Sequence, residues 1–369
     1  MLLGGVIVTG CGQPPPIIID SADSDCAWNQ GGGDFNRASY ISLVSSDITE
    51  PSWTRTFKRR LSVEPTAAYG KIFVPTADRR LYVISNIDGS RLLEKKYKNA
   101  IVAPVIISDS LAVLLVDGEK LVVENWIVHK TVWEAELDGS FIEPLIMLDN
   151  IYWIDGKNLL RCHKLRDGVR IWDRKLDVHF SCTITGSSEG VFLAGDNGVI
   201  YCYETSSGRT KWTSDTGSRM RNPPVIVEDY LVFGGADGSV GRLNAADGSS
   251  VWNTDLKSPI TAPLASDGEG IYIGTNDRYI YRLDFESGDI EWMRKIGGPV
   301  KAGPTLTENL AVFVSIDYRA YFVDKINGGI IYIYKTDGML TTRPLVCDGK
   351  ILIAGEDKKL YCFDIAGEE

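Results

Sequence analysis

Apolar residues recur along this chain at one long, fixed interval. Aromatic or aliphatic side chains stand 39 or 40 residues apart at Trp53, Leu93, Trp133, Trp172, Trp212, Trp252, Trp292 and Tyr332. A second series keeps the same period, with one gap that falls on Ile184: Pro65, Pro104, Pro144, Pro224, Pro263, Pro304 and Pro344. Two series in phase indicate eight repeats. A period of this length is typical of a β-propeller in which each repeat is one four-stranded blade.

Within each repeat, short apolar segments alternate with tight turns. Residues 231–235 and 239–243 are strand-like, and Asp237-Gly238 stands between them. Asp-Gly or Asn-Gly pairs occupy this turn in four repeats, at 117–118, 155–156, 197–198 and 237–238. Such pairs are typical of tight hairpin turns, because Asn, Asp and Gly tolerate the positive φ angles that these turns require. A later turn carries a glycine four residues before the aromatic position in six repeats, and His129 in the second. We therefore predict an all-β fold with a hairpin at the centre of each blade.

The register also predicts how the ring closes. Trp53 precedes the first complete repeat, and the last repeat starts at Pro344 and ends before its own aromatic position. We expect residues 52–57 to supply the outer strand of the last blade, which leaves no open seam. The prediction is an eight-bladed propeller over residues 26–369. We expect docking side chains between its blades at Trp53, Trp133, Trp172, Trp212, Trp252, Trp292 and Tyr332.

Two of the repeats carry a family resemblance. Residues 244–252, NAADGSSVW, and residues 284–292, DFESGDIEW, resemble the tryptophan-docking repeat of the pyrroloquinoline-quinone-type propellers. The resemblance extends over nearly the whole chain from Trp28, including a leader, Trp28–Tyr40, similar to the segment that often precedes the first blade. That family contains both quinoprotein dehydrogenases and non-catalytic scaffolds, so the resemblance predicts the fold rather than the chemistry.

The amino terminus favours the non-catalytic scaffolds over the dehydrogenases. Residues 2–8 are an apolar run, and Val8-Thr9-Gly10-Cys11 resembles a lipobox, in which the cysteine is lipidated. We interpret residues 1–11 as a lipoprotein signal-like segment and residues 12–25 as a flexible tether. Because the run is short and lacks a preceding Lys or Arg, we expect the true start upstream. The alternative is a cysteine that follows an apolar start by chance.

An eight-bladed propeller of this type behind a lipobox resembles the BamB-like lipoproteins of the outer-membrane β-barrel assembly machinery. The resemblance implies a monomeric, non-catalytic scaffold without a cofactor, anchored through Cys11 and facing the periplasm. It also implies docking on the barrel-inserting subunit and presentation of unfolded clients along exposed strand edges. The nearest counterpart of the family's docking loop is Arg219, Met220 and Arg221, although these residues do not reproduce the family pattern. Ordinary solvated loop charge is the alternative for the two arginines.

A quinone-dependent enzyme is one alternative function. The loops that lead into each inner strand should place Glu64, Glu143, Asn222 and Arg343 around the mouth of a central channel. Such groups could hold a hard cation and a quinone carboxylate, or could simply be hydrated. The quinoprotein resemblance also requires an adjacent cysteine pair and long insertions, and neither is present in the sequence. We therefore assign no catalytic residue. A stand-alone binding propeller with another partner is a further alternative.

Charge and cysteine content limit the classes of binding partner and of cellular compartment. A net charge of −10 argues against nucleic acid. Cys162, Cys202 and Cys362 occupy one strand position in their repeats, so we interpret them as buried strand residues and expect no metal site. Unassigned cysteines, among them Cys26, Cys182 and Cys347, argue against an oxidising compartment. Basic residues from Arg55 to Lys98 crowd the first blade, as a solvated edge strand or as a surface for anionic lipid or an acidic partner.

Overall fold

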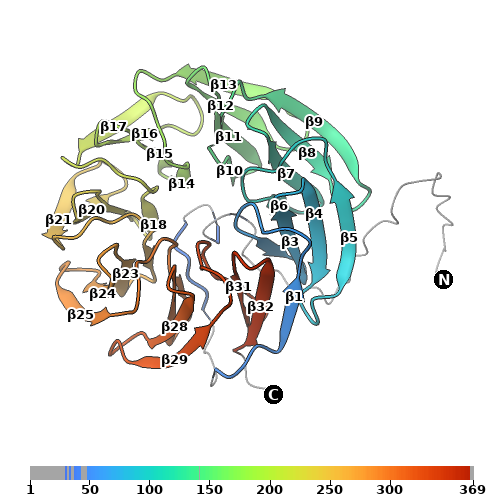
Figure 1. The fold of residues 1–369 in the computed structure, drawn as a ribbon. Helices are drawn as coiled ribbons and strands as arrows, with labels where there is room; N and C mark the ends of the chain where they lie inside the picture. Colours follow the sequence, from blue (N-terminus) through green and yellow to red (C-terminus); the bar gives the residue numbers. More distant parts are fainter. Residues whose placement is uncertain (1–29, 31–32, 35–36, 43–47, 141, 366–369) are drawn as a thin grey trace, which may run out of the picture.

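Eight four-stranded antiparallel sheets form a closed ring (Figure 1). The computed structural model describes residues 30, 33–34, 37–42, 48–140 and 142–365. Cys11, Cys26, Trp28 and the expected signal and tether segments lie outside the described residues. The described chain forms strands and turns, and it contains no helix long and apolar enough to cross a membrane. The predicted eight-bladed, all-β propeller is confirmed.

The first four blades follow one another from the first repeat. Each runs from an inner strand at the axis to an outer strand at the rim (Figure 1). Blade 1 is β2 (Thr66–Ala68), β3 (Lys71–Thr76), β4 (Arg80–Ser85) and β5 (Arg91–Lys96). Blade 2 is β6 (Ile106–Ser108), β7 (Leu111–Val116), β8 (Lys120–Asn125) and β9 (Lys130–Glu136). Blade 3 is β10 (Leu145–Met147), β11 (Asn150–Ile154), β12 (Leu159–Lys164) and β13 (Arg170–Lys175). Blade 4 is β14 (Thr185–Ser187), β15 (Gly190–Ala194), β16 (Val199–Tyr203) and β17 (Thr210–Asp215).

The remaining blades complete the circle. Blade 5 is β18 (Val225–Val227), β19 (Tyr230–Gly234), β20 (Ser239–Asn244) and β21 (Ser250–Asp255). Blade 6 is β22 (Ala265–Ser266), β23 (Gly270–Gly274), β24 (Tyr279–Asp284) and β25 (Ile290–Lys295). Blade 7 is β26 (Thr305–Leu306), β27 (Leu310–Ser315), β28 (Arg319–Asp324) and β29 (Ile330–Lys335). Blade 8 is β30 (Leu345–Cys347), β31 (Lys350–Ala354) and β32 (Lys359–Asp364), with β1 (Trp53–Thr56) as its outer strand.

The ring closes through β1. This strand pairs antiparallel with β32, with Trp53 opposite Cys362 and Thr56 opposite Lys359. The amide of Ser52 donates to the carbonyl of Cys362 at 2.8 Å and so extends the pairing. The predicted closure by residues 52–57 is confirmed. Because sequence-distant segments share this sheet, opening the ring requires the loss of a complete strand ladder.

Tryptophan side chains join neighbouring blades. In six cases the indole Nε1–H donates to a backbone carbonyl 32 or 33 residues further on, at 2.7–3.3 Å. The pairs are Trp53 with Asn86, Trp133 with Leu165, Trp172 with Thr205, Trp212 with Ala245, Trp252 with Phe285, and Trp292 with Lys325. Tyr332 instead donates its hydroxyl to Glu50 at 3.2 Å. Each indole therefore satisfies its polar atom while its ring packs between two blades.

One junction departs from this rule in two coupled ways. Between blades 1 and 2 the aromatic position is Leu93, and the glycine that receives the ring elsewhere is replaced by His129. His129 keeps a positive φ of 57°, close to the 66° of Gly89. Trp126, at the position of the usual carbonyl acceptor, fills the same hydrophobic cluster as Leu93 and Phe73. A tryptophan from the following blade thus replaces the missing ring at Leu93.

The turn between the two middle strands agrees with the prediction in blades 2, 4 and 5, where Gly118, Gly198 and Gly238 have positive φ angles of 65°, 83° and 101°, and differs from it in blade 3. In blade 3 the left-handed residue is Asn158, with φ 62°, rather than Gly156. Gly156 has another role, because a β-carbon there would come within 1.7 Å of the carbonyl oxygen of Asp138. Several turns also adopt a positive φ without glycine, as at Arg278 and Lys358. The flanking strand pairs, rather than residue type alone, impose this turn.

Candidate functional site

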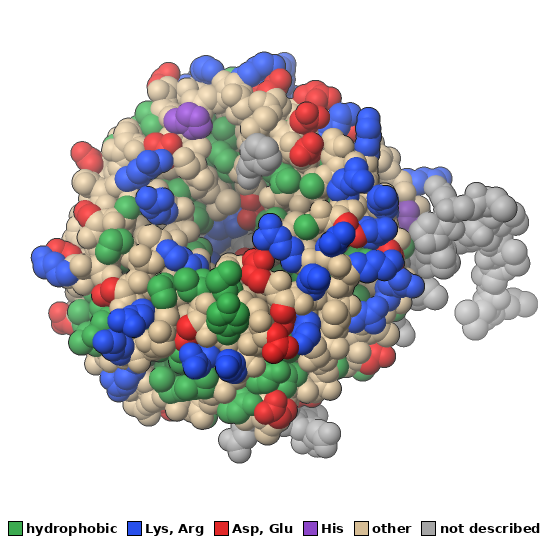
Figure 2. All heavy atoms as spheres, in the orientation of Figure 1, with side chains coloured by type: hydrophobic (Ala, Val, Ile, Leu, Met, Phe, Trp, Pro, Cys, Tyr) green, Lys and Arg blue, Asp and Glu red, His purple; other side chains and the backbone are tan. Residues whose placement is uncertain are grey.

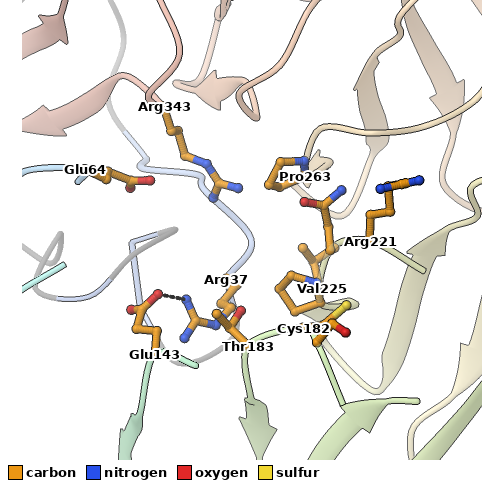
Figure 3. Close-up of a pocket in the computed structure, with 12 residues that line it drawn as sticks. Arg37, Glu64, Glu143, Cys182, Thr183, Arg221, Val225, Pro263 and Arg343 are labelled. Carbon is orange, nitrogen blue, oxygen red and sulfur yellow. Dashed lines mark hydrogen bonds and ion pairs between the residues drawn. The ribbon is translucent and has the colours of Figure 1, made fainter. Parts of the chain in front are cut away.

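A polar cavity of about 200 Å³ lies at the axis of the ring (Figure 3). The four residues predicted for the channel mouth, Glu64, Glu143, Asn222 and Arg343, all line it. Each stands in the connection just before an inner strand: β2, β10, β18 and β30, respectively. Blades that are far apart in the sequence therefore bring their connections together at one point.

The leader contributes a further charged residue to this cavity, Arg37, which was not predicted from the sequence. Its Nη1 lies 3.2 Å from Oε2 of Glu143, and its Nε–H donates to the carbonyl of Ile184 at 2.8 Å. The two side chains of this ion pair are only 5% and 8% exposed. A buried pair of this kind holds its segment firmly, because removal of one partner leaves a desolvated charge.

The backbone of the leader follows the inner strands. Ser266 of β22 donates its amide to the carbonyl of Ala38 at 3.1 Å. The amide of Leu306 in β26 donates to the carbonyl of Ser39 at 2.9 Å, and the carbonyl of Leu306 accepts from the amide of Ile41 at 3.1 Å. Residues 37–41 thus bind the open edges of two inner strands. The channel is partly filled by its own chain, which limits the space beside the polar residues.

Arg343 is a further buried charge at this cavity. It is 6% exposed, and its Nη1 donates to Ser39 Oγ. Burial is the largest influence and lowers the pKa of its guanidinium. The negative charge of Glu64 raises this pKa, and the positive charge of Arg37 lowers it further. Within the described parts of the chain, no carboxylate forms an ion pair with Arg343, and its Nε is buried without a hydrogen-bond partner. The guanidinium lies over Gly303, where a β-carbon would come within 2.6 Å of Nη2.

Of the three residues predicted to dock a partner, the structure exposes the two arginines and buries the methionine. Arg219 is exposed and lies 3.1 Å from Asp196, and Arg221 is exposed at the rim of the cavity. Met220 does not face a partner: it is 1% exposed and packs in the cluster that contains Phe233. Met220 forms an isolated antiparallel bridge with Gly235, so its backbone is extended. Along an extended backbone neighbouring side chains point in opposite directions, which buries Met220 between two exposed arginines.

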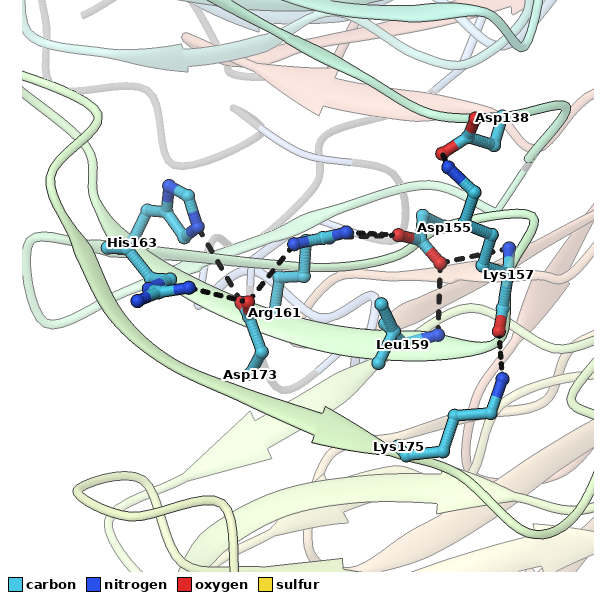
Figure 4. A network of polar contacts seen from close by, with 9 residues as sticks. Asp138, Asp155, Lys157, Leu159, Arg161, His163, Asp173 and Lys175 are labelled. Carbon is cyan, nitrogen blue, oxygen red and sulfur yellow. Dashed lines mark hydrogen bonds and ion pairs between the residues drawn. The ribbon is translucent and has the colours of Figure 1, made fainter.

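A second polar network lies in blade 3 and is structural (Figure 4). Asp155 is buried and accepts from Nε and Nη2 of Arg161 at 2.9 and 2.7 Å. Its other oxygen accepts the amides of Lys157 and Leu159 at 3.0 Å each. Arg161 also bonds Asp173 at 3.1 Å. The groups around Asp155 satisfy one another and fix the turn, so we assign this network a structural role.

The cysteines and histidines form no metal site in the described residues, where no group of three or more potential ligands is found. Four cysteines are free and buried, at Cys162, Cys182, Cys202 and Cys362, whereas Cys347 is disulfide-bonded. Burial raises the pKa of the Cys182, Cys202 and Cys362 thiols to about 12. Cys347 is therefore not one of the loose thiols that the sequence analysis counted against an oxidising compartment.

The charge and apolar residues are unevenly distributed on the surface. Figure 2 shows Lys and Arg gathered on the right, over blade 1. Acidic neighbours offset part of this charge: Glu94 lies 3.7 Å from Lys58, Glu356 lies 3.2 Å from Arg60, and Glu124 lies 2.6 Å from Lys95. Hydrophobic side chains gather at the lower rim instead, over β29 (Figure 2).

The comparison with protein families gives one description. The family model described as outer membrane protein assembly factor BamB matches residues 156–253 and 236–369. Curated proteins of that name from Shewanella oneidensis and Marinobacter adhaerens are 34% identical over 96 residues and 31% identical over 97 residues. Each alignment covers 26% of this chain and 24% of the relative. The chain thus spans about a quarter of the length of these curated relatives.

Solved structures of two kinds share the fold. BamB from Moraxella catarrhalis aligns with a TM-score of 0.71 at 17% identity, over 86% of this chain and 99% of that one. A quinohemoprotein alcohol dehydrogenase from Comamonas testosteroni aligns with a TM-score of 0.76 at 10% identity, over 95% and 82%. At these identities the likeness shows the propeller alone. It does not separate an assembly factor from a dehydrogenase.

Proposed function

Because this chain belongs to the family of outer membrane protein assembly factor BamB, we propose that it is a non-catalytic scaffold in the assembly of outer-membrane β-barrel proteins. The observation that carries the proposal is the family match over residues 156–253 and 236–369. The even repeats support it, since the blades follow one another without a domain inserted between them in the described chain. On this proposal the protein faces the periplasm and acts through binding.

The partner on this proposal is the barrel-inserting subunit, and the docking residues are Arg219 and Arg221. Both arginines are exposed beside the axial cavity. Arg219 is paired with Asp196, but no ion pair of Arg221 is found within the part of the chain that the structure describes. An exposed and unpaired guanidinium favours a carboxylate of the partner, because it can bind it with two parallel hydrogen bonds.

Unfolded clients are the second binding partner on this proposal, and β29 is the edge that fits them. It is the outermost strand of blade 7, so one side of its backbone has no partner strand within the sheet. Ile330, Ile331 and Ile333 are 39%, 55% and 46% exposed. An extended client segment could add to such an edge through main-chain hydrogen bonds, with apolar side chains on either side.

Affinity purification tests the assembly role. The tagged protein is recovered from its own membranes in mild detergent, and the co-purifying proteins are identified by mass spectrometry. We expect the barrel-inserting subunit, and we expect Arg221→Glu to remove it. Arg209→Glu is the matched control, because Arg209 is an exposed arginine at the outer turn of blade 4. Recovery of the protein without that subunit would contradict the assembly role.

Client capture is tested separately at β29. Ile331→Lys should reduce cross-linking to an unfolded outer-membrane protein, while Val251→Lys should not. Val251 occupies the equivalent position of β21 in blade 5 and is 47% exposed. An equal effect of the two substitutions would mean that charge at any rim position acts, and the β29 assignment would be wrong.

Lipid anchoring through Cys11 is a further part of the proposal and lies outside the described residues. The supporting observation is the apolar run that ends in Val8-Thr9-Gly10-Cys11. Metabolic labelling with palmitate tests it directly. Labelling of the natural chain that disappears in Cys11→Ala supports the anchor, and labelling that persists in the variant removes it.

A further inference from the structure

Among the described residues, the axial cavity holds a buried cation, Arg343, that forms no direct ion pair with a carboxylate. Arg343 is 6% exposed, and its contact with Ser39 is to a neutral hydroxyl. A guanidinium stays charged in proteins, and burial of an unpaired charge is costly. Arg37 offers no relief, since it carries the same charge and is already paired with Glu143. The fold therefore maintains an unfavourable charge at a defined place.

Some hydrogen-bond donors at this cavity have no acceptor. Within the described part of the chain, Nε of Arg343 and Nδ2 of Asn222 are both buried and lack a hydrogen-bond partner. They come from the connections into blade 8 and blade 5, so different parts of the ring supply them. Figure 3 shows the Arg343 side chain extending into the space that these residues surround. Buried donors are almost always satisfied in proteins, so this pair indicates an absent acceptor.

The space and the charge together define that acceptor. Among the lining residues, Arg37 and Glu143 neutralise each other, which leaves Arg221 and Arg343 against Glu64. The remaining charge favours an anion. The cavity volume of about 200 Å³ lies below the range of sites for drug-sized ligands and cofactors. A planar guanidinium and an amide N–H that line one cavity suit a carboxylate, whose two oxygens can each accept a hydrogen bond.

We propose that the cavity binds a small carboxylate anion between Arg343 and Asn222. Gly303 belongs to this site, because a side chain there would take the space of the Arg343 guanidinium. Ser39 orients the guanidinium from the other side, so the leader forms part of the wall. Anion binding should therefore stabilise the leader in the channel. The proposal does not rest on the assembly role; Arg221 lines the cavity and belongs to both, so the anion site is tested at Arg343 and Asn222 instead.

Thermal unfolding with acetate and succinate as probes tests the site. A ligand that binds only the folded protein stabilises it with the logarithm of its concentration. For a chain of this size, each tenfold rise above the Kd should raise the Tm by about 2 °C. Chloride and sulfate at equal ionic strength are the comparison. An equal rise with chloride would reduce the effect to ionic strength and would overturn the proposal.

Variants locate the binding. Arg343→Gln should abolish the response to carboxylate, and Asn222→Ala should weaken the Kd, measured by calorimetry, about tenfold through the loss of one hydrogen bond to a charged group. Asn222 is only half-buried, so this variant keeps the test valid if Arg343→Gln does not fold. Arg209→Gln, far from the axis, is the matched control. An unchanged response in both cavity variants would contradict the site.

Discussion

The indole ring of Trp212 lies directly against Gly248 of the following blade. A β-carbon added to Gly248 would come within 2.5 Å of Cε3 of the ring, and Gly248 has a φ of 74°. The same relationship joins Trp53 to Gly89 and Trp292 to Gly328. At the one docking position occupied by a leucine, Leu93, the residue that replaces the glycine is His129. Ring and glycine therefore form one packing unit at the six junctions where the docking residue is a tryptophan.

Gly248→Ala should destabilise the protein. The added methyl group collides with the Trp212 ring, and the positive φ disfavours an L-residue, so we expect a loss of about 2 kcal/mol or more. Urea unfolding followed by tryptophan fluorescence measures it. His129→Gly is the control, because the docking position of that junction is Leu93 rather than an indole, and it should change stability by less than about 1 kcal/mol. Similar losses in both variants would mean that the ring contact is unimportant.

The ion pair of Arg37 and Glu143 should hold the leader in the channel. Arg37→Met removes one partner of a buried pair, for which we expect a loss of about 3 kcal/mol. Urea unfolding gives this value, and limited proteolysis should show earlier cleavage near residue 40. A double-mutant cycle with Glu143→Gln isolates the interaction. Strictly additive effects would show that the two side chains act independently.

The free cysteines should be inert in the folded protein. Because burial raises the pKa of Cys202 and Cys362 to about 12, the thiolate is about a thousandfold scarcer than for an ordinary thiol at the same pH. Ellman's reagent at pH 8 should therefore label four more thiols in guanidinium than in buffer. Rapid labelling of the native protein at these positions would contradict their burial.

Acid should weaken the protein partly through His163. Burial is the largest influence and lowers its pKa below the ordinary 6.5, although the Nδ1 contact with Gly168 and the charge of Asp173 oppose it. The unfolded chain therefore takes up a proton more readily, so stability falls as the pH drops below 6.5 and through the folded pKa. His163→Gln should reduce this slope in urea unfolding between pH 7 and 5. An unchanged slope would assign the effect to other groups.

The repeat pattern predicts much of this molecule, because a propeller repeats one local structure. The eight blades and the closure by β1 follow from two periodic series, and the connections before each inner strand place Glu64, Glu143, Asn222 and Arg343 at one cavity. Arg37 was not predicted, since it lies outside the repeats and its position depends on long-range pairing of the leader. Met220 was misjudged because its side chain turns inward between two exposed arginines.

Direct binding tests the central claim. Purified protein is titrated with the periplasmic domains of the barrel-inserting subunit from the same organism, and binding is followed by biolayer interferometry. The account predicts saturable binding that Arg221→Glu weakens at least tenfold, because a reversed charge opposes the partner's carboxylate, while Arg209→Glu leaves it unchanged. Absence of binding by the natural chain, with the propeller folded, would contradict the assembly role.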